Sequence, residues 1–293
     1  MTLYPIETGN FKLDGGAMFG VVPKALWQKT NPADSNNMID IAARSLLIEN
    51  GNRLILIDTG MGAKQSKKFF GYYYQCGDYT IDTSLAKYGF HRDDITDVFM
   101  THLHFDHCGG SIQWNSDRTG YESAFKNASF WTNKAHWEWA TKPNLRENAS
   151  FLKENLLPMQ ESGQLKFVSR NPLDSKGETA FLEDSELGFG ILFADGHTEK
   201  QMIPHITYQE KTLIFTADLI PTVGHIPVPY VMGYDTRPLI TLTEKDKFLN
   251  KAAKNDYLLF FEHDAHNEIC TLQQTEKGVR LNQIHTFKDI FKH

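Results

Sequence analysis

The chain has 293 residues, of which 41% are hydrophobic and 23% charged, a composition typical of a folded globular protein with room for one large domain or two ordinary ones. Its net charge of −6 disfavours a nucleic-acid partner, because an acidic surface repels phosphate backbones. The first residues lack a cationic region followed by an apolar run, and no apolar stretch approaches the roughly 20 residues that span a bilayer, so we expect neither a secretory signal nor a membrane partner. The three cysteines are too far apart for a disulfide framework or a Cys-x-x-Cys zinc site, which favours a cytoplasmic location.

The predicted elements mix strands and helices over the whole length. Residues 19–37 are rich in proline and asparagine and predict a loop with one helical turn around Trp27. Residues 45–49 and 53–58 are apolar runs separated by Gly51-Asn52, which predicts a β-hairpin. Residues 95–100 predict a buried strand. Further strands are expected at 128–131, 189–193, 213–216 and 257–261, and helices at 81–88, 134–140, 149–161 and 244–253. No linker separates the halves, so we expect a single α/β domain.

Four potential metal ligands follow the strand predicted at 95–100: His102, His104, Asp106 and His107. At the end of an extended strand, positions i and i+2 point to the same side, so the first two histidines can share one metal ion. If the chain then turns into a helix at Asp106, this residue and His107 point toward a second position beside the first. The glycines at 109–110 permit close backbone packing at a helix start.

The pattern His-x-His-x-Asp-His resembles the signature of the metallo-β-lactamase superfamily, and the later parts of that family's pattern follow in order. Residues 194–198 resemble its Gly-His-Thr element through His197. Residues 216–218 resemble its strand-end element through Asp218, and residues 261–264 its last element through His263. Asp58 matches an early aspartate that supports the site in that family without being a ligand.

This resemblance implies a four-layer αββα sandwich with mixed sheets, formed by one domain over residues 1–293. It also implies two zinc ions per chain, although iron, cobalt and manganese suit the same ligand types. The implied ligands of the first ion are His102, His104 and His197. Those of the second are Asp106, His107 and His263, with Asp218 bridging both ions. Cys108, next to His107, is expected to point away from the site.

The implied chemistry is hydrolysis by a metal-bridging hydroxide, with Asp106 as the general acid that protonates the leaving alkoxide. The residues disfavour several branches of the superfamily: flavodiiron proteins carry Glu where this chain has His104, and the main secreted β-lactamases carry Cys in place of Asp218. A type II glyoxalase needs a basic C-terminal segment that is not evident here, and the acidic balance disfavours the RNA-processing members.

What remains are the N-acyl homoserine lactonases and the methyl-parathion-type organophosphate hydrolases. Phe105 inside the motif, together with a flap or excursion over residues 10–38, resembles the lactonase, quorum-quenching branch. We therefore expect hydrolysis of N-acyl homoserine lactones, with an arylesterase or phosphotriesterase as the alternative. A non-catalytic binding module is disfavoured because every ligand position is filled.

The chain departs from many lactonases three residues after the bridging aspartate, where their tyrosine is replaced by Pro221. His225 and Tyr230 are the candidates for its catalytic role, and the alternative is a proline-rich loop with an exposed histidine and a packed tyrosine. The substrate is expected to be a small molecule, and the oligomeric state is left open, with a homodimer among the options. The candidates for lining an acyl-chain groove are Phe105, Met18, Phe19 and Phe69.

Overall fold

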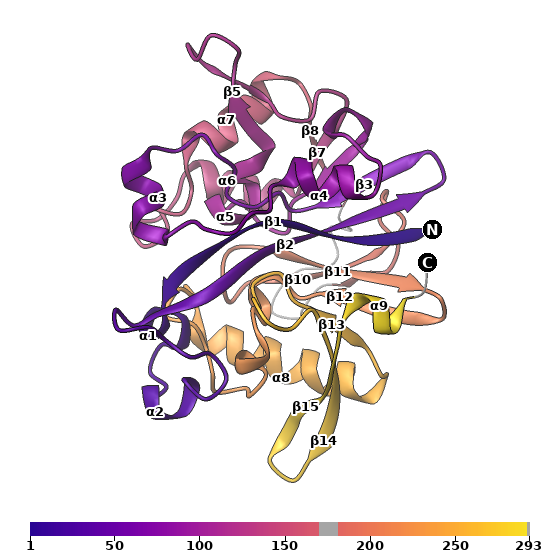
Figure 1. The fold of residues 1–293 in the computed structure, drawn as a ribbon. Coiled ribbons are helices and arrows are strands. Elements are labelled where there is room, and N and C mark those ends of the chain that lie inside the picture. The colour runs from indigo at the N-terminus through magenta and orange to yellow at the C-terminus, as the bar shows by residue number, and fades with distance from the viewer. Residues whose placement is uncertain (170–180, 292–293) are drawn as a thin grey trace. The chain divides into compact units, whose positions relative to one another are not determined.

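The computed structural model describes residues 1–169 and 181–291. The chain divides into two compact units, each made of two segments of sequence. Unit 1 comprises Met1–Asn10 and Ala43–Asn171, and unit 2 comprises Phe11–Ala42 and Pro172–His293. Figure 1 labels the elements in chain order.

The larger sheet of unit 1 has six strands in the order β1-β2-β3-β4-β7-β8, of which β1 and β2 continue into unit 2. It is mixed: β2 and β3 are antiparallel, whereas β3, β4, β7 and β8 run parallel. After their first residues, Arg53 and Asp97, β3 and β4 are apolar, as is typical of parallel strands that are buried on both faces. The strands are β1 (Thr2–Asp14), β2 (Met38–Asn50), β3 (Arg53–Ile57), β4 (Asp97–Phe99), β7 (Ser129–Thr132) and β8 (Leu165–Phe167), with a separate hairpin of β5 (Ile112–Trp114) and β6 (Tyr121–Ser123).

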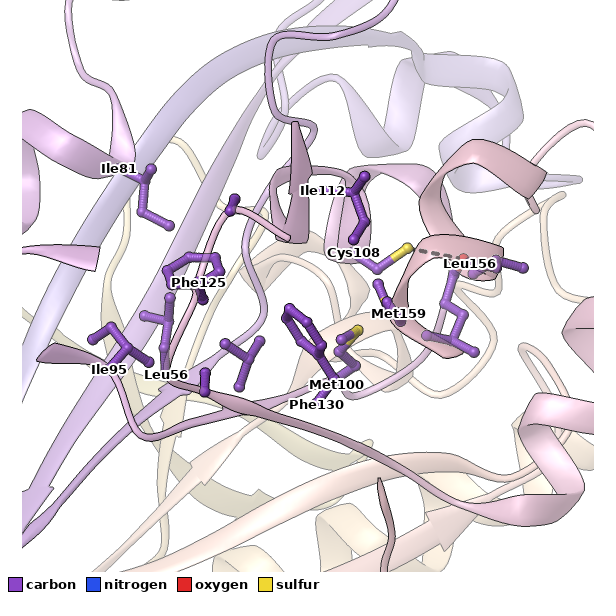
Figure 2. Close-up of a cluster of buried hydrophobic side chains, with 14 of the residues drawn as sticks. Leu56, Ile81, Ile95, Met100, Cys108, Ile112, Phe125, Phe130, Leu156 and Met159 are labelled. Atoms are coloured by element: carbon purple, nitrogen blue, oxygen red, sulfur yellow. Dashed lines mark hydrogen bonds between the residues drawn. The ribbon is translucent and has the colours of Figure 1, made fainter. Parts of the chain in front are cut away.

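The helices of unit 1 enclose a hydrophobic core against this sheet. Figure 2 shows the cluster, in which Leu56 of β3 and Phe130 of β7 lie among side chains from the helices and loops. Cys108 is fully buried in this cluster and its thiol faces the carbonyl oxygen of Leu103 at 3.3 Å, so it points into the core as predicted. The helices are α3 (Lys67–Tyr73), α4 (Ile81–Lys87), α5 (Phe105–Cys108), α6 (Lys134–Thr141) and α7 (Lys153–Glu161), with 3₁₀ turns η1 (Arg92–Asp94) and η2 (Gly109–Ser111).

Unit 2 contains a seven-stranded sheet in the order β15-β14-β13-β12-β11-β10-β9, again mixed because β12 and β13 are parallel and the other pairs are antiparallel. The long helix α8 packs against β14 (Figure 1). The strands are β9 (Phe181–Leu182), β10 (Gly190–Ala194), β11 (Gln201–Tyr208), β12 (Lys211–Phe215), β13 (Leu258–Phe260), β14 (Ile269–Thr275) and β15 (Gly278–His285). The helices are α1 (Gly15–Phe19), α2 (Lys24–Trp27), α8 (Pro238–Lys254) and α9 (Phe287–Ile290), with 3₁₀ turns η3 (Ala217–Leu219) and η4 (Val223–His225).

Most predicted elements are confirmed, and their ends differ for local reasons. The hairpin pairs Asn50 with Arg53 across Gly51-Asn52, and α2 is the helical turn expected at Trp27. α8 begins six residues earlier than predicted because Pro238, at its first turn, is preorganised for a helix start. α7 begins only at Lys153. In the described part of the chain, no helix is both long and apolar enough to cross a membrane.

Candidate metal centre

The turn after β4 and the short helix α5 that follows it carry the first four predicted ligands, all in unit 1. β4 ends at Phe99, and His102 and His104 follow the strand, as expected, in the turn that leads to α5. Nε2 of His102 lies 3.0 Å from Nδ1 of His104, which confirms that the two rings face each other. The predicted turn into a helix is also confirmed, since α5 begins at Phe105.

Asp58 orients the fourth of these residues, His107. It follows β3 with a left-handed backbone (φ 56°) and is completely buried. Its carboxylate accepts hydrogen bonds from the amide (2.8 Å) and hydroxyl (2.6 Å) of Thr101, and it lies 3.1 Å from Nδ1 of His107. Because Nδ1 is held by this carboxylate, Nε2 is the nitrogen of His107 that remains for a ligand.

The glycines at 109–110 hold this turn against the segment after β3. A Cβ atom on Gly110 would lie 2.2 Å from the carbonyl oxygen of Thr59, and one on Gly109 equally close to that of Met61. Thr59 in turn donates from its amide to the carbonyl oxygen of His107 at 2.7 Å. The predicted close packing is confirmed, although it occurs at the end of α5 and not at its start.

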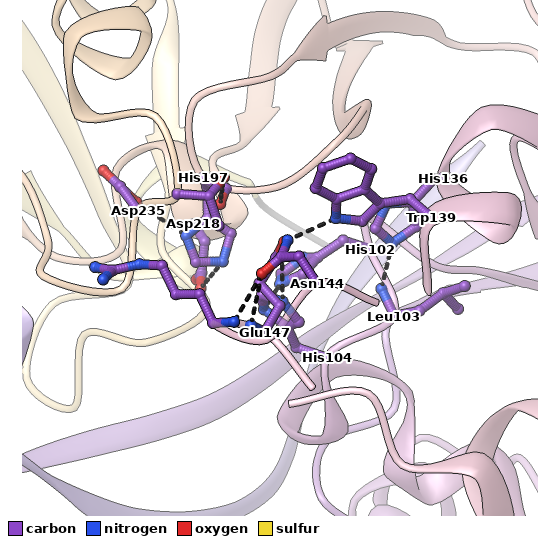
Figure 3. A network of polar contacts seen from close by, with 12 residues as sticks. His102, Leu103, His104, His136, Trp139, Asn144, Glu147, His197, Asp218 and Asp235 are labelled. Carbon is purple, nitrogen blue, oxygen red and sulfur yellow. Dashed lines mark hydrogen bonds and ion pairs between the residues drawn. The ribbon is translucent and has the colours of Figure 1, made fainter. Parts of the chain in front are cut away.

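Two polar residues that the sequence analysis missed hold the same turn (Figure 3). Glu147 is buried, accepts hydrogen bonds from Trp139 and Asn144 at 2.7 Å, and lies 3.4 Å from Nε2 of His104. His136 accepts a hydrogen bond from the amide of Leu103 at 2.8 Å. No motif marks either residue, because each comes from a segment more than 30 residues further along the chain.

The remaining three predicted ligands come together in unit 2. Asp218 lies in η3, directly after β12, and its two carboxylate oxygens each lie 3.1 Å from an Nε2 atom, one of His197 and one of His263. The Nδ1 atom of His197 lies 2.9 Å from Asp235, and that of His263 lies 2.9 Å from the carbonyl oxygen of Ala42. Both imidazoles therefore present Nε2 to the same carboxylate.

The electrostatics of this group favour a bound cation. Burial by itself lowers the pKa of His197, but the charges and hydrogen bonds of Asp218 and Asp235 outweigh it and raise the pKa to about 10. Two buried carboxylates thus stabilise a positive charge between them, which a metal ion can supply in place of a proton.

The predicted ligands of unit 1 and those of unit 2 both suit a metal ion, because of the chemistry of their donor groups. Metal-ligating histidines typically donate their second ring N–H to a carboxylate or carbonyl group, which fixes the tautomer. His107, His197 and His263 have such an acceptor at Nδ1, and His104 has one at Nε2. Imidazole and carboxylate donors suit zinc and also iron, cobalt and manganese.

The substrate-contact candidates of unit 1 form an aromatic group beside the ligand turn. The ring centroids of Phe69 and Phe105 lie 5.1 Å apart, and Tyr73, which was not predicted, contacts both at 5.1 and 4.9 Å. Burial, and then the charge of Asp106, raise the pKa of Tyr73, so its phenol stays protonated near that carboxylate.

Three of the four candidates of unit 2, Met18, Phe19 and His225, are almost completely buried. His225 stacks on Phe19 at 4.2 Å, and its ring nitrogens lie 2.8 Å from the hydroxyl of Thr222 and 2.9 Å from the carbonyl oxygen of Met18. Burial lowers the pKa of His225 to about 3. The exposed histidine of the alternative interpretation is therefore wrong. Tyr230 is half-buried, with its ring centroid 6.4 Å from that of Phe19.

Comparisons with known proteins agree with the motif. Residues 40–263 match the model of the metallo-β-lactamase superfamily. An N-acyl homoserine lactonase from Bacillus cereus is 24% identical over 245 residues, which cover 79% of this chain and 85% of that protein. A solved structure of a probable metal-dependent hydrolase from Staphylococcus aureus is 27% identical, with a TM-score of 0.82 and coverage of 97% of this chain and 95% of that chain.

A second solved structure is that of AidC, a dizinc quorum-quenching lactonase in complex with a product. It is 24% identical, with a TM-score of 0.73 and coverage of 97% of this chain and 94% of that chain, which shows a shared fold. The predicted fold class, an α/β sandwich with mixed sheets, is confirmed by these matches and by the strand pairing. The chain belongs to the metallo-β-lactamase superfamily.

Proposed function

We propose that this protein is a metal-dependent hydrolase that opens the lactone ring of N-acyl homoserine lactones. The observation that carries the proposal is that each unit contains histidines with one ring nitrogen held by an acceptor, which leaves the other nitrogen for a metal ion. The chain also matches the superfamily over residues 40–263. The lactonase from Bacillus cereus and AidC support the substrate class.

The seven ligands are divided between two ions in this proposal. Unit 1 supplies four of them and unit 2 three. Zinc is favoured because these donors suit it and because AidC is a dizinc enzyme. In this assignment His102, His104 and His197 would hold the first ion, Asp106, His107 and His263 would hold the second, and Asp218 would be a ligand of both.

When bound, the divalent ions would supply Lewis-acid chemistry: they would lower the pKa of a bound water from about 15.7 toward about 7 and polarise a carbonyl oxygen. Hydrolysis adds the water oxygen to the lactone carbonyl carbon and breaks the ring C–O bond, after which the leaving alkoxide needs one proton. Asp106 accepts the proton that the water gives up and passes it to the alkoxide. It suits this role because it is the most exposed of the four ligands in unit 1.

The aromatic group of Phe69, Tyr73 and Phe105 supports an acyl substrate. Aromatic rings provide a large apolar surface, and the tyrosine adds a hydrogen-bond donor beside it. Met18 and Phe19 are 1% and 0% exposed, so a contribution from them to the groove remains a prediction.

Tyr230 is the better candidate for the residue that contacts the lactone carbonyl. His225 and Tyr230 line the same small pocket as Asp218 within unit 2. Both ring nitrogens of His225 lie against acceptor or hydroxyl oxygens of the fold, which suits a residue that shapes the loop. Tyr230 is half-buried, and its phenol can donate a hydrogen bond.

The test is a pH-stat assay of ring opening with zinc-loaded protein and homoserine lactones of short and long acyl chains. We expect turnover of the lactones, two bound ions per chain by elemental analysis, and an at least 100-fold loss of kcat/KM in Asp218→Ala. Tyr230→Phe should lower kcat/KM more than His225→Gln does. Turnover of aryl esters or phosphotriesters without any ring opening would instead establish the alternative activity and refute the lactonase.

A further inference from the structure

Unit 1 contains a cavity of about 630 Å³ that the proposed hydrolase does not use. This volume is within the range of about 300–1,000 Å³ that is typical of small-molecule sites. None of the seven predicted ligands lines it. Its walls come from five parts of the chain: residues 8–9 of β1, residues 59–64 after β3, residues 75–82 before and within α4, Arg92 of η1, and residues 110–118 around β5. We call it the Lys64 cavity.

The charges that line the Lys64 cavity are predominantly positive, in a chain whose net charge is −6. Arg92 forms an ion pair with Asp82, the one acidic residue of the lining, and the two charges balance. Lys64 and Arg118 remain as two cations.

Among the described residues, neither remaining cation has a carboxylate within ion-pair distance. Lys64 is 6% exposed, and its ammonium group donates to the carbonyl oxygen of Gly109. Within residues 1–169 and 181–291, no carboxylate forms an ion pair with Lys64 or with the exposed Arg118. Burial lowers the pKa of Lys64 to about 8, so the group still carries its charge at pH 7. The charge of Glu154 offsets only part of the cost of burying this ammonium group, since burial still lowers its pKa, and a bound anion would offset more of it.

Aromatic side chains form part of the same wall. Trp114 donates from its indole N–H to the carbonyl oxygen of Lys64 at 3.0 Å and packs against Tyr121 at 4.5 Å, which fixes its ring. Tyr79 also lines the cavity and is 57% exposed. Rigid aromatic surfaces bind flat apolar groups at a low entropic cost.

We propose that the Lys64 cavity is a second ligand site, which binds a small organic anion with a flat apolar body and a carboxylate-like group. The anionic group lies between Lys64 and Arg118, and the apolar part lies along Trp114. The occupant also contacts Thr59, whose amide bonds to the carbonyl oxygen of His107 at 2.7 Å, so the site shares a wall with the ligand turn.

The experiment is isothermal titration of the zinc-loaded full chain with 2-naphthoate and with its neutral isostere 2-naphthamide. We expect one naphthoate per chain and at least tenfold weaker binding of the amide, since hydrogen bonds to charged groups are worth about tenfold or more in affinity. Lys64→Met and Arg118→Gln should each weaken naphthoate binding at least tenfold. Lys134→Gln, which removes an exposed charge outside the lining, is the matched control and should bind like the wild type.

Equal affinity for the acid and the amide, or no binding of naphthoate, would overturn the proposal. So would an affinity for naphthoate that Arg118→Gln leaves unchanged, because the carboxylate would then be bound elsewhere, for instance by the metal ions. Arg118 lies in an exposed turn, so this variant stays informative even if Lys64→Met does not fold. Loss of lactone hydrolysis is not a readout, and the outcome is therefore independent of the proposed enzyme activity.

Discussion

Replacing Asp58 by asparagine changes one atom of a buried carboxylate and should reverse the tautomer of a ligand histidine. In the variant, Oδ1 must stay an oxygen, because it accepts a hydrogen bond from the amide of Thr101. The new NH₂ group therefore takes the place of Oδ2, which lies 3.1 Å from Nδ1 of His107. A donor now faces Nδ1, which must become an acceptor, and the ring proton moves to Nε2, the nitrogen needed for the metal. Asparagine tolerates the left-handed backbone at this position, so the fold is retained.

We expect zinc affinity to fall about 10–100-fold, or about 1.4–2.7 kcal/mol, which is the usual effect of replacing a group that orients a metal-ligating histidine. It is measured by titrating metal-free protein with zinc in competition with a fluorescent chelator. Asp97→Asn is the matched control: this aspartate is also buried in unit 1 but binds Arg53 and Trp131, so its loss should lower stability without weakening zinc binding. Wild-type zinc affinity in Asp58→Asn, or an equal loss in the control, would refute the reasoning.

Three further predictions test other parts of the structure. Glu147→Gln should weaken zinc binding about tenfold by the same competition assay, because the amide no longer fixes the second histidine of the turn, whereas unchanged affinity would assign this residue to folding alone. Gly110→Ala places a Cβ atom 2.2 Å from a backbone oxygen and should lower the free energy of unfolding by about 1–3 kcal/mol in urea, while Gly71→Ala, with open space around it, should not. Burial lowers the pKa of His205 from 6.5 to about 3, so the contribution of this residue to stability is present above pH 6.5 and is lost as the pH falls. Between pH 6.5 and 5.5 the free energy of unfolding of His205→Phe should therefore fall by about 1 kcal/mol less than that of the wild type. An unchanged pH dependence would contradict this.

Strands were predictable where their apolar residues form a run, and they were missed where the buried residues are irregularly spaced or a proline interrupts them. The β2–β3 hairpin and β4 have continuous apolar runs that belong to the interior of a sheet. β1 was missed because its buried residues, such as Leu3 and Ile6, are spaced three apart and show no alternation, and because Pro5 and Gly9 interrupt it. β11 similarly contains Pro204, which argues locally against a strand.

The candidate site also has a part that the sequence predicts, its ligands, and a part that it does not, the groups that orient those ligands. Its ligands are recognisable because two histidines that share one ion must lie on one short turn, and such a turn fixes a spacing in the sequence. The groups that orient those rings need only bring one oxygen to one nitrogen, which any segment can do. Glu147 approaches His104 from 43 residues away, and the acceptor at His263 is the carbonyl oxygen of Ala42, which carries no side-chain signal at all. A zinc affinity that depends on these acceptors would therefore be set by residues that no motif contains, and relatives with identical ligands could still differ in how tightly they hold their metals.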